Sequence, residues 1–156
     1  ISWTNAKAKA AASSHDGQQG YLATITSAAE QSFLNKLNND FVKSSPYHHG
    51  TYVSAWLGGS DAEKERHWEW VTGETPTYNN FKRGEPNNFF NEDYLVGWYS
   101  GDKWNDCHNN CNIHKYVVEY DNSPADVSAV PLPASLPLIA AGLGALGFTT
   151  RRRKTA

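Results

Sequence analysis

Five side chains in the second half of the chain carry the oxygen atoms that a hard cation prefers. They come from three short motifs: Glu85-Pro86-Asn87, Glu92-Asp93 and Trp104-Asn105-Asp106. Calcium takes about six to eight oxygen ligands from carboxylates, amide carbonyls and water. The residues that supply this mixture are Glu85, Asn87, Glu92, Asn105 and Asp106. We therefore predict a Ca2+ site at these five residues, with a cis peptide bond before Pro86.

A calcium ion held in this way keeps ligand positions open. Two neighbouring hydroxyls of a sugar can fill them, and each hydroxyl can also donate to a carboxylate and accept from an asparagine amide. The same five residues are therefore predicted to bind carbohydrate. Any single motif could instead be an ordinary polar surface loop, but three motifs in this order, with strand patterns between them, favour a binding site.

An enzymatic alternative would pair Glu85 and Glu92 as the two carboxyl groups of a glycosidase. A bound cation would keep both groups ionised, which removes the general acid. The sequence contains no Ser-His-Asp arrangement that can be recognised, no His-Glu-x-x-His motif and no phosphate-binding loop. We therefore predict a binding protein and no enzyme.

The motifs need a scaffold, and the sequence predicts two amphipathic helices before them. The first is expected over residues 2–13 and the second from Ser27 to about residue 39. The second begins with a capping box, in which the Ser27 hydroxyl accepts from the amide of Glu30 and the Glu30 carboxylate reaches back. The side chains expected to be buried are Trp3, Ala6 and Ala10 in the first helix and Phe33, Leu34 and Leu37 in the second.

Short strands and one long polar segment fill the remainder of this part of the chain. Strands are predicted over residues 21–25, 52–58, 67–71, 94–98, 103–104 and 116–120. Residues 76–93 show little periodicity, and a stretch of that length is usually functional or disordered. Four tryptophans are expected mostly in the core: Trp56, Trp68, Trp70 and Trp104. Phe89 and Phe90 are expected either to pack on a sugar ring or to be buried and pin the loop.

Several further motifs accompany the three site motifs. They are Gly20-Tyr21-Leu22-Ala23-Thr24-Ile25, Trp56-Leu57-Gly58-Gly59 and Val117-Val118-Glu119-Tyr120. With Trp3, Ala6, Ser27, Glu30 and Trp70 they give residues 1–121 a dense resemblance to the C-type lectin-like family. The resemblance implies an α+β fold, with two helices flanking small antiparallel sheets and a long calcium-binding loop.

This resemblance also implies roles for particular residues. Glu85, Asn87, Glu92, Asn105 and Asp106 fall on the family's principal calcium ligands. An auxiliary calcium site is implied at Asp61, Glu65 and Asp93. In this family the Glu-Pro-Asn form accompanies sugars of the mannose and glucose type, whereas the galactose-type Gln-Pro-Asp form is absent here.

The family usually has two disulfides, but this chain holds only Cys107 and Cys111. We interpret them as a local disulfide formed in an oxidising compartment. A zinc site that adds His108 and His114, or two free thiols, remain as alternatives.

The end of the chain has a different composition. Residues 122–129 are predicted to be a linker, and residues 130–156 a tail with an apolar helix over 132–148. Those 17 apolar residues would span about 25 Å as a helix, the short limit for a membrane span. The basic run Arg151–Lys154 follows. A basic run of this kind favours the cytoplasmic side of a membrane, which would leave the body of the chain outside.

The tail resembles a PEP-CTERM sorting signal of the Val-Pro-Leu-Pro-Ala form. That resemblance implies an exported protein, held in the inner membrane by 132–148 until an exosortase cleaves near Pro131–Pro133. The processed protein would then belong to the cell surface or extracellular matrix. The chain contains no Met and begins at Ile1, so we interpret it as a fragment or a processed form whose export signal is not in view.

Charge narrows the possible partners. Residues 1–130 hold 10 basic and 16 acidic residues, a net charge of −6, which argues against a nucleic-acid partner. The predicted function is calcium-dependent binding of a mannose- or glucose-type glycan, with the producer's own exopolysaccharide as one candidate. The alternative is a structural or adhesive surface domain that binds a protein partner and uses calcium only to rigidify its loop.

Overall fold

The computed structural model describes residues 1–45 and 52–121. The predicted linker over 122–129 and the tail over 130–156, with its apolar helix at 132–148, lie outside the described residues. Among the residues that are described, no helix is both long enough and apolar enough to cross a bilayer. The fold below therefore concerns the first compact unit, Ile1–Asp121.

The first helix confirms the predicted buried face. Helix α1 (Trp3–Ala11) begins after Ser2, whose hydroxyl accepts from the backbone N–H of Asn5. Its buried side chains are Trp3, Ala6 and Ala10. The small alanines let the helix lie close to the sheets, and the indole N–H of Trp3 donates to the Leu57 carbonyl at 2.7 Å.

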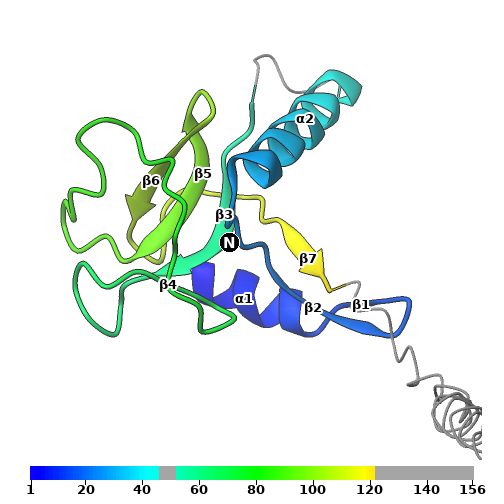
Figure 1. Cartoon of the computed structure of the whole chain (residues 1–156), viewed down its shortest axis with the longest axis horizontal. Coiled ribbons are helices and arrows are strands. Elements are labelled where there is room, and N and C mark those ends of the chain that lie inside the picture. The colour runs from blue at the N-terminus through cyan, green and yellow to red at the C-terminus, as the bar shows by residue number, and fades with distance from the viewer. Residues whose placement is uncertain (46–51, 122–156) are drawn as a thin grey trace, which may run out of the picture. The chain divides into compact units, whose positions relative to one another are not determined.

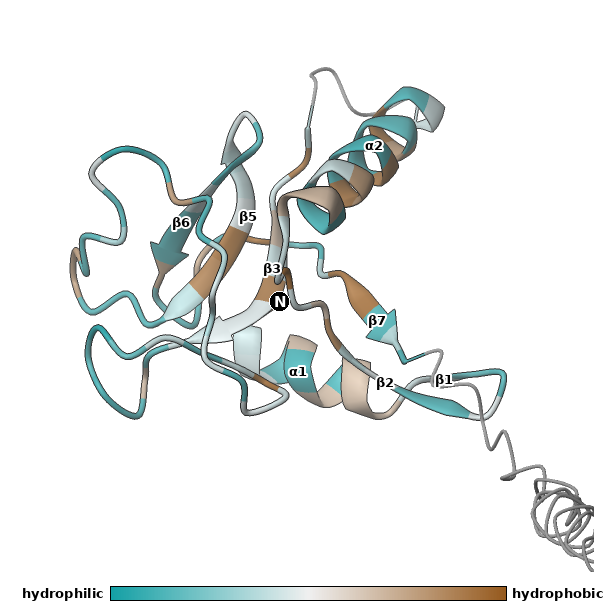
Figure 2. Ribbon diagram, viewed as in Figure 1, coloured by the Kyte–Doolittle hydropathy of each residue, from teal (hydrophilic) through white to brown (hydrophobic). Residues whose placement is uncertain are grey.

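The second helix is longer than predicted, and its buried side chains are not the predicted ones. Helix α2 (Ala28–Ser44) begins with the predicted capping box, since the Glu30 N–H donates to the Ser27 hydroxyl. The helix continues to Ser44 and does not end near residue 39. The predicted buried stripe is wrong: Phe33 is 66% exposed, Leu37 is 52% exposed, and Leu34 alone of the three packs partly against the core. Brown segments along α2 in Figure 2 mark hydrophobic residues on this helix.

Amide side chains hold α2 against the remainder of the domain. Gln31 is buried, and its Oε1 accepts from the indole N–H of Trp104 at 2.8 Å. Asn35 Oδ1 accepts from Trp98 Nε1 at 2.7 Å. Asn38 makes a paired bond, donating to the carbonyl of Val53 and accepting from its N–H. Because Asn38 bonds outward, it does not compete with the helix backbone, which explains why the helix passes through it.

The strands form two small antiparallel sheets, as the resemblance implied. The three-stranded sheet has the order β1-β2-β7, from β1 (Ser14–His15), β2 (Gln18–Leu22) and β7 (Val118–Tyr120). The four-stranded sheet has the order β4-β3-β5-β6, from β3 (Ala55–Ser60), β4 (Glu69–Trp70), β5 (Tyr94–Ser100) and β6 (Lys103–Cys107). The predicted strands lie within a few residues of these, except for β1, which was not predicted. Figure 1 shows the long segment between β4 and β5 as a loop without a labelled element.

Large aromatic side chains fill the core, as predicted. Trp56, Trp70 and Trp104 are at most 3% exposed, and Trp68 is half-buried. Strand β3 passes so close to the end of β2 that Gly58 has no room for a side chain. A Cβ there would lie 2.5 Å from the Leu22 carbonyl oxygen, and the Gly58 N–H donates to the Ala23 carbonyl at 2.8 Å. This close approach links the two sheets.

Candidate metal centre

The long loop is fastened to strand β6 just before the first site motif. Phe81 forms a bridge with Trp104, and the N–H of Lys82 donates to the Trp104 carbonyl at 3.0 Å. The N–H of Glu85 then donates to the carbonyl of Lys82. Glu85 is thereby held beside the strand that carries Asn105 and Asp106. The peptide bond between Glu85 and Pro86 is cis, as predicted.

Three carboxyl groups of the predicted site share one electrostatic environment. Asp106 is fully buried, whereas Glu85 and Glu92 are half-buried. Burial raises the pKa of Glu85, and the Asp106 charge raises it further, while Lys82 opposes the shift. Burial likewise raises the pKa of Glu92, with added repulsion from Asp106 and Glu85. The carboxylates therefore repel one another, which is the arrangement that a divalent cation relieves.

Several oxygen atoms of this cluster have no hydrogen-bond donor among the described residues. They are Glu85 Oε2, Asn105 Oδ1 and Asp106 Oδ1, all buried. An unpaired buried acceptor costs about 1–3 kcal/mol. Carboxylate and amide oxygens are the ligands that calcium prefers, so the donor set of this cluster fits that ion. The buried oxygens come from the loop and from β6, two stretches that are distant in sequence.

Asn87 is the predicted ligand with the weakest tie to this cluster. It is exposed, and its Oδ1 accepts from the N–H of Phe89 at 2.8 Å. Among the described residues, its side chain makes no hydrogen bond to Glu85, Glu92, Asn105 or Asp106. Its position is set by the neighbouring residue, Asn88, whose N–H donates to Asp106 Oδ2 at 2.7 Å.

Asn88 connects the two predicted ion sites, a role that the sequence analysis missed. Its Oδ1 accepts from the Glu92 N–H at 2.7 Å, and its side-chain NH2 donates to the carboxylate of Glu65. It thus contacts Asp106 and Glu92 of the principal set and Glu65 of the auxiliary set. Its place between two acidic motifs was the available signal, because an amide can donate and accept at once whereas a carboxylate only accepts.

The auxiliary residues also lie near one another. Asp61 is buried, its N–H donates to the carbonyl of Asp93 at 3.1 Å, and its Oδ1 has no donor within the described residues. Burial raises the pKa of Asp61, and the charges of Glu65 and Asp93 raise it further. The side chain of Asp93 accepts from Asn91 at 2.8 Å. Asp61 thus carries a buried, unpaired oxygen and is influenced by the charges of Glu65 and Asp93.

The turn between the site motifs presents two exposed aromatic rings. Phe89 is 64% exposed and Phe90 is 83% exposed, with ring centroids 4.2 Å apart. Of the two expectations for these residues, exposure is therefore the correct one. Phe90 and Asn91 both adopt left-handed backbone conformations, with φ of 58° and 66°. The turn is held by Asn87 and Asn88, so the rings stand beside the predicted ligands.

Cys107 and Cys111 form a disulfide, which confirms the predicted pairing. The zinc alternative is wrong, because both sulfurs are bonded to each other and neither is available as a thiolate ligand. The Glu92 carboxylate lies within 4.8 Å of these sulfurs. The disulfide follows Asn105 and Asp106 directly and so supports the end of β6.

Removing this disulfide is expected to lower the free energy of unfolding by about 2 kcal/mol, the loop-entropy value for so short a loop. The variant is Cys107→Ser with Cys111→Ser, measured by urea unfolding in EGTA. The native chain in dithiothreitol is the control and should unfold at the same midpoint as the double variant. Equal midpoints for the oxidised native chain and the double variant would show that the bond contributes nothing.

The fold and the oxygen-rich loop define an α+β lectin-like domain. The chain belongs to the C-type lectin domain family. The model of that family, described as "Lectin C-type domain", matches residues 2–118. A PEP-CTERM protein-sorting motif matches residues 129–154. Both matches agree with the resemblances noted from the motifs.

Individual relatives agree with this assignment. Halomucin of Haloquadratum walsbyi is 32% identical over 96% of this chain but only 2% of its own length. A C-type lectin of Micrurus corallinus is 35% identical over 55% of this chain and 52% of its own. Among solved structures, the EPNH mutant of CEL-I, a C-type lectin from Cucumaria echinata, matches with a TM-score of 0.65 and 25% identity, over 78% of this chain and 83% of that chain. This chain therefore spans 2% and about half of the length of these two sequence relatives.

Proposed function

We propose that the domain is a calcium-dependent lectin for glycans of the mannose and glucose type. The observation that carries the proposal is the set of buried, unpaired oxygens on Glu85, Asn105 and Asp106. Calcium would be held by these residues together with Asn87 and Glu92. When bound, the ion offers open positions to two neighbouring sugar hydroxyls.

The chain's own residues contribute selectivity at this site. The carboxylate of Glu85 accepts from a hydroxyl, and the side-chain NH2 of Asn87 donates to one. The order Glu-Pro-Asn therefore sets which hydroxyl donates on each side. The name of the EPNH mutant of CEL-I contains the letters EPN, the same order as residues 85–87.

The test is titration calorimetry of the full chain with methyl α-mannoside, in calcium and in EGTA. We expect saturable binding in calcium and none in EGTA. Equal binding in both solutions would contradict the calcium role. Calcium binding without any response to mannoside, glucoside or N-acetylglucosaminide would contradict the sugar role and favour a protein partner, an alternative that the exposed Phe89 and Phe90 also suit.

A second calcium ion is proposed at Asp61, Glu65 and Asp93. The unpaired Asp61 Oδ1 supports this proposal. Because Asn88 contacts both groups of acidic residues, filling one site would order the loop for the other. Calorimetry without sugar would then give a calcium stoichiometry of two.

The remainder of the chain suggests where the lectin acts. We propose that 1–121 is the lectin domain, 122–129 a linker and 130–156 a sorting tail. The matched sorting motif supports export, membrane anchoring through 132–148 and exosortase cleavage near Pro131–Pro133. The processed lectin would reach the cell surface or matrix, where exopolysaccharide is a candidate ligand. Mass spectrometry of the exported protein should find a C-terminus near residue 133.

Truncating Phe90 is expected to weaken glycan binding severalfold without changing calcium affinity. The ring is 83% exposed beside the predicted ligands, so its removal takes away a packing surface for the sugar and costs no core contact. Phe90→Ala is compared with Phe33→Ala, which removes a similarly exposed ring from α2. Equal mannoside affinities for the two variants would show that Phe90 plays no part in recognition.

A further inference from the structure

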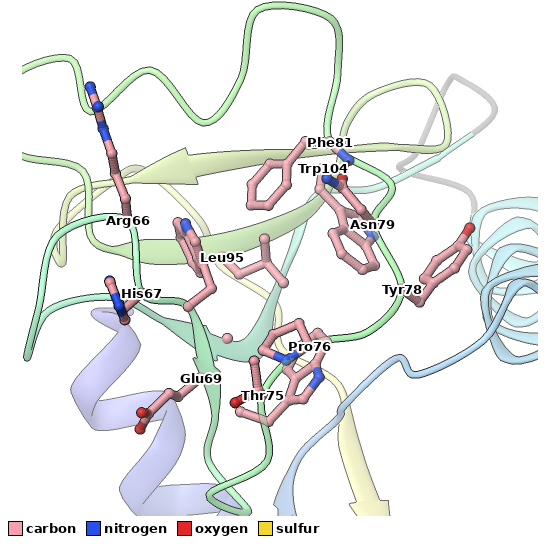
Figure 3. A pocket seen from close by; sticks show the side chains of 13 residues that line it. Arg66, His67, Glu69, Thr75, Pro76, Tyr78, Asn79, Phe81, Leu95 and Trp104 are labelled. Carbon is pink, nitrogen blue, oxygen red and sulfur yellow. Dashed lines mark hydrogen bonds between the residues drawn. The ribbon is translucent and has the colours of Figure 1, made fainter.

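A cavity lies between the four-stranded sheet and the first part of the long loop, apart from the proposed calcium site. Its volume is about 310 Å³, and its lining includes five large aromatic side chains: Trp68, Trp70, Tyr78, Phe81 and Trp104. Figure 3 shows Tyr78, Phe81 and Trp104 along one side, with His67 and Glu69 on the other. None of the five predicted calcium ligands lines this cavity. It is a separate site on the same domain.

The aromatic walls of the cavity are fixed in place by one another. The ring of Trp104 contacts Trp70, Tyr78 and Phe81 edge-on, with centroids 6.0, 5.6 and 5.7 Å away. Trp68 packs against Phe81 in the same manner at 5.2 Å. Gly59 belongs to the floor, where a Cβ would lie 2.9 Å from Leu95. These contacts make the cavity a preformed space.

The tryptophans of this cavity differ from the other tryptophans in their hydrogen bonding. Among the chain's six tryptophans, four donate to protein acceptors: Trp3 to Leu57, Trp56 to Ile1, Trp98 to Asn35 and Trp104 to Gln31. The indole nitrogens of Trp68 and Trp70 are buried, and neither finds an acceptor within the described part of the chain. Trp70 as a whole is 3% exposed. The side chains that carry both unpaired donors line this one cavity, so a ligand with acceptor oxygens would reach these donors by a small shift of the rings.

We propose that this cavity binds a single pyranose ring without calcium. Its volume is at the small end of ligand pockets, which run from about 300 to 1,000 Å³, and so suits one ring and no extended chain. The C–H groups of a sugar ring pack on aromatic side chains, and its hydroxyl oxygens accept from the indoles. A hydroxyl can at the same time donate to Glu69, which an aromatic hydrocarbon cannot do. This site would hold a second sugar unit and is independent of the proposed calcium function.

The experiment follows the indole N–H signals of the full chain by ¹H–¹⁵N NMR in EGTA. The probes are methyl α-mannoside, methyl β-glucoside and methyl β-galactoside, each titrated in the millimolar range. We expect saturable shifts of the Trp68 and Trp70 signals with at least one sugar, while the Trp3 and Trp56 signals stay in place. No shift with any of the three sugars, or shifts with benzoate alone, would overturn the proposal.

Variants locate the binding and separate the two sites. Trp68→Phe and Trp70→Phe each remove one N–H and should weaken the NMR-detected binding by about two- to tenfold, the effect of one hydrogen bond. Trp98→Phe removes an indole outside the cavity and is the matched control. Asp106→Asn should leave these shifts intact in EGTA even though it disables the calcium site. Loss of the shifts in Asp106→Asn would overturn the independence of the two sites.

Discussion

Replacing Asp106 with Asn is expected to remove calcium-dependent stabilisation while leaving the calcium-free chain at least as stable as the native one. Asp106 is fully buried, and its charge raises the pKa of both Glu85 and Glu92. Without calcium, the three carboxylates repel one another, so losing one charge relieves repulsion. The Asn oxygen can still accept from the N–H of Asn88, which keeps the turn in place.

With calcium, the same change would remove a charged ligand from the proposed site. Losing one partner of a buried charge pair costs about 3–5 kcal/mol. Because each 1.4 kcal/mol or so is tenfold in affinity, calcium should bind at least about a hundredfold more weakly. At a calcium concentration about 100 times the native Kd, stabilisation should fall from about 2.7 to about 0.4 kcal/mol.

Thermal unfolding in calcium and in EGTA measures both effects in one experiment. Asp102→Asn is the matched control, since it makes the same substitution in the β5–β6 turn, where Asp102 pairs with partly exposed Lys103 at 3.6 Å. That variant should keep the full calcium response. A calcium-induced rise in Tm that survives in Asp106→Asn would refute Asp106 as a ligand, and a drop in Tm in EGTA would refute the repulsion argument.

The candidate site could be proposed from the sequence because its chemistry is local. Glu-Pro-Asn and Trp-Asn-Asp each place oxygen-bearing side chains within three residues, and the residue types name the ion they suit. The link through Asn88 escaped prediction for the opposite reason. Its three bonds reach Asp106, Glu92 and Glu65, and two of these partners are distant in the chain. Such a role depends on tertiary positions that spacing does not encode.

The fold was predictable wherever burial and period agree. Trp3, Ala6 and Ala10 lie at helical spacing and are buried. The strands that contain Trp56 and Trp104 were predicted from their apolar residues, and both tryptophans are buried. Helix α2 is the exception, because a search for apolar periodicity selected Phe33 and Leu37, both exposed. The stripe that faces the domain is Gln31, Asn35 and Asn38 at i, i+4, i+7 spacing, followed by buried Val42, so it is mostly polar. The helical period was therefore present in the amide side chains. Two of them accept from tryptophan indoles, and the third pairs with the backbone of Val53.

The amide side chains by which α2 packs on the domain lead to the second large prediction. Asn35→Leu should lower the free energy of unfolding by about 2–4 kcal/mol. Asn35 Oδ1 accepts from Trp98 Nε1 and from Gln31 Nε2, at 2.7 and 2.8 Å. The substitution leaves both donors without their acceptor, at about 1–3 kcal/mol each. Leu is also the better helix former, by less than about 0.7 kcal/mol, so the loss must come from tertiary hydrogen bonds.

The reverse substitution, Phe33→Asn, is the matched control on the same helix. Phe33 is 66% exposed, so this change should alter stability by no more than about 0.5 kcal/mol. Urea unfolding in EGTA with a constant m-value measures both variants. If Asn35→Leu proved neutral and Phe33→Asn costly, α2 would be held by its apolar face after all.

The amide stripe also matters for the site, because Gln31 holds Trp104, the residue that precedes Asn105 and Asp106 in β6. Loosening α2 should therefore weaken calcium binding without touching a ligand.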